Sequence, residues 1–96
     1  MTKRINLDEL RLFYLTVHDD ENGNITKYSL DIEAANDVHY EFSPKQNEII
    51  CNRISKELGI SSNLDTADLM RKYLTVKSNG YLISLVSDNC TVQYFY

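Results

Sequence analysis

The chain of 96 residues is long enough for one domain with a single hydrophobic core and too short for two. A hydrophobic content of 43%, a charged content of 25% and a net charge of −4 are ordinary for a globular protein and argue against disorder. No apolar run approaches the roughly 20 residues of a membrane-spanning helix, and the first residues lack the apolar segment of a secretory signal. We therefore expect a cytoplasmic protein with no membrane partner.

The first expected element is a β-hairpin between residues 10 and 32. Residues 10–18 are rich in β-formers, and Asn22-Gly23 is the strongest short signal for a hairpin turn, because both central residues of a type I′ turn need positive φ. A shift of one residue would move every side chain to the other face, so the register is well specified. The expected pairs are Val17 with Tyr28, Leu15 with Leu30 and Phe13 with Ile32 on an apolar face, and His18 with Lys27, Thr16 with Ser29 and Tyr14 with Asp31 on a polar face.

A third strand is expected over residues 38–42, where apolar and polar residues alternate. A three-residue loop at Ala35-Asn36-Asp37 would connect it to the hairpin. This loop pairs Ile32 with Tyr40, Leu30 with Phe42, Glu33 with His39 and Asp31 with Glu41. The chain is therefore predicted to begin as a three-stranded meander with one apolar face and one acidic face.

Two helices are expected next. The sequence "SPKQ" indicates a helix start with Ser43 as N-cap, Pro44 at N1 and Gln46 completing a capping box, and Gly59 supplies the C-cap. A second helix over about 65–75 starts near Asp65 and ends at "KSNG". The expected core residues are Ile49, Ile50, Ile54 and Leu58 in the first helix and Ala67, Met70, Tyr73 and Leu74 in the second.

The last 16 residues, 81–96, are expected to form a second hairpin with its turn at Asp88-Asn89. It pairs Leu85 with Val92 and Ile83 with Tyr94. Together, the registers of the two hairpins place Leu12, Leu82 and Phe95 on the outer side of the sheet. The order β-β-β-α-α-β-β predicts an α+β fold, a single domain over residues 1–96 in which an antiparallel sheet of about five strands carries two helices on one face.

The sequence contains few candidates for catalysis or metal binding. No glycine-rich nucleotide loop is present, and Cys51 and Cys90 are too far apart for a CxxC pair, so two reduced thiols are expected. His39 shares the acidic face with Asp31 and Glu41, which suits a metal site or an acid/base pair, or simply a solvated polar face, the interpretation we favour. We expect no enzymatic activity, no metal and no cofactor.

Residues 54–61 resemble the first half of a helix-turn-helix motif, in which a helix ends at Leu-Gly-Ile-Ser, here Leu58 to Ser61. The hairpin expected at 81–96 would correspond to the wing of a winged helix. The second helix opens with Asp65 and Asp68, however, and carboxylates at that position repel DNA phosphates. A winged-helix-like DNA-binding transcription regulator, using Asn63, Arg71 and Lys72, is therefore the alternative function.

Charge is unevenly distributed along the chain. Residues 19–41 hold seven acids and one base, whereas residues 43–77 hold six bases and four acids. Carboxylates two residues apart on one strand lie about 6.6–7 Å apart, close to the phosphate spacing of one DNA strand, so an acidic sheet could occupy a basic groove built for nucleic acid. The same acids could instead only maintain solubility and protect the sheet edges. The acids are Asp19, Asp20, Glu21, Asp31, Glu33, Asp37 and Glu41.

In its small size, acidic charge and richness in Asn, Ile, Lys and Tyr, the whole chain resembles small inhibitors encoded by phages and mobile elements of low-GC Gram-positive bacteria, anti-CRISPR proteins above all. The likeness rests on no motif and transfers no residue role. It implies a non-enzymatic inhibitor that occupies the nucleic-acid groove of a nuclease or nuclease–guide complex. A further alternative is an oligomerising module that forms a homodimer through the C-terminal strand, where Tyr94, Phe95 and Tyr96 are clustered.

Overall fold

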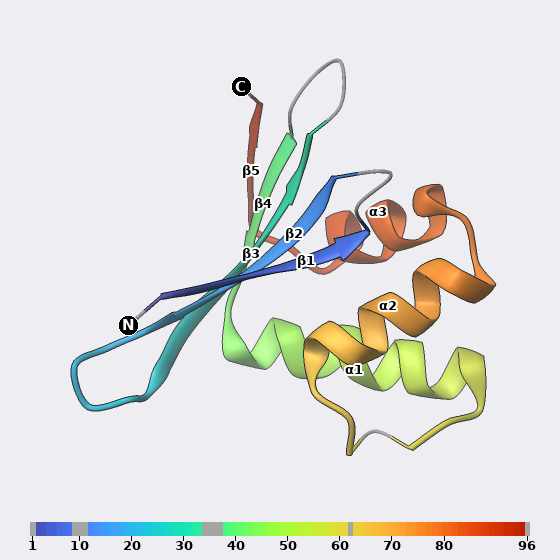
Figure 1. Ribbon diagram of the computed structural model, residues 1–96, viewed down its shortest axis with the longest axis horizontal. Coiled ribbons are helices and arrows are strands. Elements are labelled where there is room, and N and C mark those ends of the chain that lie inside the picture. The colour runs from blue at the N-terminus through green and yellow to red at the C-terminus, as the bar shows by residue number, and fades with distance from the viewer. Residues whose placement is uncertain (1, 9–11, 34–37, 62, 96) are drawn as a thin grey trace.

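The computed structural model describes residues 2–8, 12–33, 38–61 and 63–95. Five antiparallel strands lie side by side in the order β1-β2-β3-β4-β5, and all three helices gather on one side of this twisted sheet (Figure 1). The α+β class with a five-stranded antiparallel sheet is confirmed, but the prediction of two helices is wrong. The elements are β1 (Lys3–Asp8), β2 (Phe13–Asp19), β3 (Ile25–Ile32), β4 (Val38–Phe42), α1 (Pro44–Leu58), α2 (Thr66–Val76), α3 (Asn79–Asp88) and β5 (Val92–Phe95).

The register of the β2–β3 hairpin is confirmed at all six predicted pairs, from Phe13 opposite Ile32 to His18 opposite Lys27. The turn itself differs from the type I′ turn expected. Gly23 has a φ of 83°, but Asn22 does not have positive φ, and the register shifts after His18. The carboxylate of Asp20 accepts hydrogen bonds of 2.9 Å from the backbone N–H groups of Asn22 and Asn24, which stabilises a longer loop.

The predicted register between β3 and β4 is wrong by two residues. Tyr28 lies opposite Phe42, and their rings stack with centroids 5.7 Å apart and an interplanar angle of 9°. This aromatic pair favours the observed register. Because the error is even, every side chain stays on its predicted face, but His39 lies opposite Asp31 instead of Glu33, and Glu41 lies opposite Ser29. The loop expected at 35–37 is outside the described residues.

Strand β1 was not foreseen, although its sequence alternates in the same way as the other strands. Ile5 and Leu7 point towards the helices and contribute to the core, while Arg4 and Asn6 point to the opposite side. The strand pairs with β2 and forms one edge of the sheet.

The first two helices begin and end as predicted. Ser43 Oγ accepts the N–H of Gln46, and Gln46 Oε1 accepts the N–H of Ser43, which completes the capping box, and Gly59 ends α1 with a φ of 64°. Asp65 caps α2. The core face of α1 is only partly as predicted, because Ile50 and Ile54 are fully buried whereas Ile49 is 44% exposed.

The hairpin predicted at 81–96 is wrong. Asn79–Asp88 forms helix α3, and only Val92–Phe95 forms a strand, which pairs with β4. Leu82, Leu85 and Val86 are buried at helical spacing, so this segment covers the apolar sheet with one stripe of a helix. Leu82, expected on the outer side of the sheet, is fully buried. None of the helices in the described part of the chain is long and apolar enough to cross a membrane.

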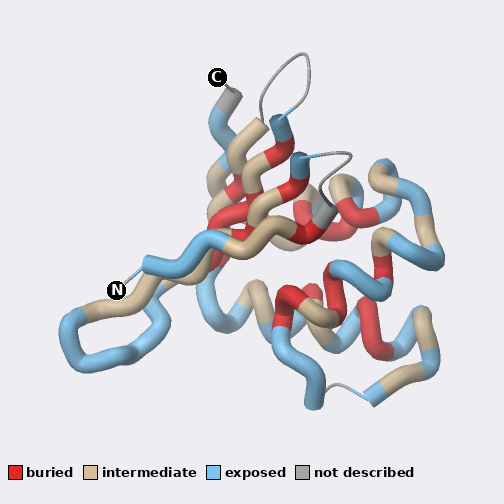
Figure 2. Tube along the Cα trace, viewed as in Figure 1, coloured by how far each residue is buried: buried red, intermediate tan, exposed pale blue. Residues whose placement is uncertain are grey.

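The core lies between the sheet and the helices (Figure 2). We call the side of the sheet that packs on the helices the inner face and the opposite side the outer face. The strands contribute Leu7, Phe13, Leu15, Tyr28, Leu30, Ile32, Tyr40 and Phe42 to the buried core. The outer face carries several closely spaced ionisable side chains, among them Asp31, His39 and Glu41.

Candidate functional site

All three helices lie on the inner side of the sheet, so the outer face is uncovered by them (Figure 1). The strand registers place two rows of side chains across this face. One row runs Arg4, Thr16, Ser29, Glu41, Val92, and the other runs Asn6, Tyr14, Asp31, His39, Tyr94. The outer face is therefore a continuous surface built from all five strands.

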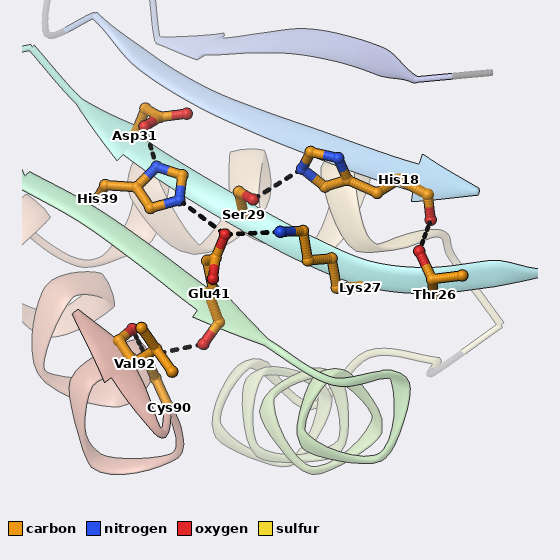
Figure 3. A network of polar contacts seen from close by, with 9 residues as sticks. All are labelled: His18, Thr26, Lys27, Ser29, Asp31, His39, Glu41, Cys90 and Val92. Atoms are coloured by element: carbon orange, nitrogen blue, oxygen red, sulfur yellow. Dashed lines mark hydrogen bonds and ion pairs between the residues drawn. The ribbon is translucent and has the colours of Figure 1, made fainter. Parts of the chain in front are cut away.

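His39 belongs to a chain of polar contacts across β3 and β4 (Figure 3). Its Nδ1 donates to Asp31 Oδ1 at 2.5 Å, and its Nε2 lies 3.3 Å from Glu41 Oε1. Glu41 Oε1 also accepts from Lys27 Nζ at 2.8 Å. The Lys27 ammonium holds the pKa of Glu41 below its ordinary value, and the Glu41 carboxylate raises the pKa of Lys27.

His18 belongs to the same surface, where it is hydrogen-bonded to a hydroxyl group. Its Nε2 is hydrogen-bonded to Ser29 Oγ at 2.9 Å, and Ser29 is only 1% exposed although it lies on the outer face. Burial, and secondarily the charge of Lys27, lowers the pKa of His18. The imidazole of His18 is therefore uncharged at neutral pH.

A second ionic contact ties β1 to the outer face. Arg4 Nη2 donates to Glu33 Oε1 at 3.0 Å, and the guanidinium carbon lies 3.7 Å from the centre of the Tyr14 ring. The Arg4 and Glu33 side chains are 52% and 44% exposed, so this ion pair is open to solvent and contributes little to stability. Because β1 was not foreseen, the partner of Glu33 was not foreseen either.

The structure brings three of the seven predicted acids together, not all seven. All three lie on the outer face, where Asp31 is hydrogen-bonded to His39 and Glu33 and Glu41 pair with Arg4 and Lys27. Asp20 and Glu21 lie in the loop between β2 and β3, and hydrogen bonds from the backbone of Asn24 and Asn22 lower the pKa of Asp20. The other two are Asp19, which the alternation of β2 places on the inner side, and Asp37, which is outside the described residues.

The sequence matches no protein-family model, and comparisons with curated proteins and with solved structures found no match. The chemistry of the site must therefore be judged from its own geometry. Both ring nitrogens of His39 contact carboxylates, and its side chain is only 13% exposed, so the imidazole mainly links β3 to β4. Among the residues that the structure describes, no group of three or more His, Cys, Asp or Glu side chains is arranged to hold a metal ion.

The helix-turn-helix interpretation loses part of its support. Gly59 does end α1 in the left-handed conformation, but the predicted wing is helix α3 followed by one strand. Arg71 donates to the backbone carbonyl of Asn6 at 3.2 Å and pairs with Asp68 at 3.4 Å. Arg71 is thus engaged within the protein, whereas Asn63 and Lys72 are exposed.

Both cysteines are free thiols, as predicted. Burial raises the pKa of Cys51, which lies 3.5 Å from Thr66 Oγ1, so this thiol stays protonated and unreactive. Cys90 Sγ donates to the carbonyl oxygens of Glu41 and Val92 at 3.1 and 2.8 Å. Cys90 therefore helps to hold β5 beside β4, below the outer face (Figure 3).

Proposed function

We propose that this chain is a non-enzymatic protein-binding module that inhibits its partner by occupying a basic nucleic-acid-binding groove, such as that of a CRISPR effector nuclease. The observation that supports this proposal is the placement of Asp31, Glu33 and Glu41 together on a sheet face that none of the three helices covers. The anti-CRISPR kind of inhibitor, to which the chain is similar in size, charge and composition, gives the class of partner.

The ion pairs on the outer face are suited to exchange. The Arg4 side chain is 52% exposed and the Lys27 side chain 44% exposed, and such surface pairs contribute only about 0–1 kcal/mol to folding. Arginines of a partner can therefore replace Arg4 and Lys27 at little cost, with the advantage of bidentate contacts to the carboxylates. Tyr14 and Tyr94 lie in the same row as Asp31 and add aromatic contact area.

The surplus of negative charge lies beside this surface. The charges of the three carboxylates on the outer face are nearly balanced by those of Arg4 and Lys27. The β2–β3 loop carries Asp20 and Glu21, and the sequence from Asp19 to Thr26 contains no basic residue. Figure 1 shows that this hairpin extends past the helices. The projecting loop would steer the outer face towards a basic groove and increase the association rate.

The proposal is tested by measuring DNA cleavage by a panel of guide-loaded CRISPR effector nucleases in the presence of increasing concentrations of the protein. We expect inhibition of at least one nuclease. The variant D31N/E33Q/E41Q should inhibit about tenfold more weakly or worse, because it removes the carboxylates but keeps the side-chain shapes.

The matched control is E48Q/D68N/D88N, which removes three acids from the helices and changes the net charge by the same amount. It should inhibit as the unmodified protein does. Equal inhibition by both triple variants would mean that the outer face is not the contact surface. No inhibition of any nuclease at micromolar concentration would contradict the proposed class of partner.

A further inference from the structure

A groove lies on the inner side of the β2–β3 hairpin, opposite the outer face. It encloses about 390 Å³ between the projecting ends of β1, β2 and β3 and the start of α2. Tyr28 and Ala67 form its buried floor, and Ile5, Val17 and Ile25 form its more open apolar sides. Ile25 is 42% exposed, which is unusual for an isoleucine beside a core. The groove is at the lower end of the ligand-pocket range of roughly 300–1,000 Å³, enough for one or two large side chains.

Two hydrogen bonds fix the start of α2, which lines one side of the groove. Asp65 caps the helix by accepting the N–H of Asp68 at 2.9 Å. Thr66 Oγ1 donates to Asn47 Oδ1 of α1 at 2.9 Å, and this hydrogen bond links the first turn of α2 to α1. The hairpin extends beyond this fixed point (Figure 1), and its residues near the turn are exposed or half-buried (Figure 2).

The charge around the groove is predominantly negative. Asp19 and Asp65 line it, and Asp20 and Glu21 follow Asp19 in the adjoining loop. Among the described residues that line it, Lys3 is the one base. A basic peptide is attracted to such a rim, whereas an acidic one is repelled.

We propose that this groove is an anchor site for an apolar side chain, aromatic or aliphatic, that the protein partner presents between lysines or arginines. The inference rests on the proposed function, since it assigns a second contact to the same basic partner. The outer face lies on one side of the projecting hairpin and the groove on the other, so the partner contacts both sides of the hairpin. Interface residues that dominate the binding energy commonly fill a desolvated pocket and are surrounded by contacts that exclude water.

The test uses NMR spectra of the methyl-labelled protein titrated with a six-residue peptide in which leucine and tryptophan are flanked on each side by arginine and lysine. We expect saturable shifts of the groove methyl groups of Ile5, Val17, Ile25 and Ala67, and little change at Thr16 and Val92 on the outer face. A peptide with serine in place of leucine and tryptophan, and one with glutamates in place of the bases, should each bind much more weakly.

Two substitutions with matched controls sharpen the result. Ile25→Ser should weaken peptide binding about fivefold by removing apolar contact, whereas Ile49→Ser, at an equally exposed isoleucine on α1, should leave it unchanged. Glu21→Gln should weaken binding about twofold at low salt, and Glu48→Gln on α1 should not. No shift of the groove methyl groups, or equal effects of Ile25→Ser and Ile49→Ser, would overturn the anchor site.

The outcomes for the groove and for the outer face are separable. If Ile25→Ser inhibits a nuclease as well as the unmodified protein while D31N/E33Q/E41Q does not, the groove is not an anchor and the proposed function stands. If the groove methyl groups shift with protein concentration alone, the occupant is a second copy of the chain and the proposal of a basic partner segment is overturned.

Discussion

On β3, Leu30 and Asp31 are neighbours in sequence but lie on opposite faces of the sheet. Leu30 is fully buried between the sheet and the helices, whereas Asp31 is hydrogen-bonded to His39 on the uncovered side. The inner face is stabilised by the removal of apolar surface from water, and the outer face by ionic contacts of small net value. Exposed outer-face side chains such as Arg4 and Glu33 can therefore change with little loss of stability, whereas buried inner-face side chains cannot.

The largest expected effect is on the inner face. Leu30→Ala should lower the free energy of unfolding by about 2–5 kcal/mol, because it leaves a cavity at a site with no exposed surface in the middle of the sheet. Urea denaturation followed by circular dichroism measures the change. A loss below about 1 kcal/mol would contradict the claim that burial on this face holds the domain together.

At the next residue, Asp31→Asn should lower the free energy of unfolding by only about 1 kcal/mol or less in the same urea denaturation. The amide oxygen of asparagine can still accept the hydrogen bond from His39 Nδ1, so the contact is kept and only the negative charge of the acceptor is lost. If this substitution destabilises the protein as much as Leu30→Ala, the outer face contributes to stability as much as the buried inner face, and the stated difference between the two faces is wrong.

A smaller, pH-dependent effect is expected for Glu41. Lys27 depresses the pKa of Glu41 in the folded state below the ordinary value of 4.5, so the stabilisation is complete above that pH and is lost as the pH falls through the lowered pKa. Urea denaturation between pH 7 and pH 3 should show the unmodified protein slightly more stable than Glu41→Gln at pH 7. The difference should shrink towards pH 3, and a difference that grows on acidification would have the wrong sign.

The smallest effect concerns His18 and does not require any change in stability. The NMR chemical shifts of its ring protons should report a pKa below 6.5. Lys27→Met should raise the pKa of His18 by removing a nearby positive charge. Lys77→Met is the control, because Lys77 lies beside Tyr81 at 5.4 Å from its ring centre and does not contact the outer face. An unchanged His18 titration in Lys27→Met would show that Lys27 has no electrostatic influence at this position.

Local signals in the sequence predicted the parts of the fold that depend on neighbouring residues. The alternation of the β2–β3 hairpin set its register, and capping residues such as Ser43 and Asp65 set the starts of α1 and α2. The β3–β4 register depended on the stacking of Tyr28 on Phe42, 14 residues apart in sequence, which no local pattern reveals. In α3, the leucine, isoleucine and valine residues are compatible with both a strand and a helix. The helix buries Leu82, Leu85 and Val86 on one side, which the sequence pattern alone does not reveal.

The candidate site could be predicted only in part for the same reason. Alternation placed Asp31, His39 and Glu41 on one face, and the structure puts both carboxylates in contact with the imidazole. The contact of Glu33 with Arg4 could not be predicted without β1, and that of Glu41 with Lys27 needed the correct β3–β4 register. The groove beneath the hairpin depends on how far β2 and β3 extend past α2, which is a property of the packed domain.

The central claim is that the acidic outer face takes the place of nucleic acid on a basic protein. The most direct measurement is the fluorescence anisotropy of a labelled target duplex bound to a guide-loaded effector nuclease that the protein inhibits, titrated with the protein. We predict that the anisotropy falls to that of free duplex, and that the protein alone does not raise it even at low salt. Anisotropy that stays high, or salt-sensitive binding of the protein alone to the duplex, would contradict the account.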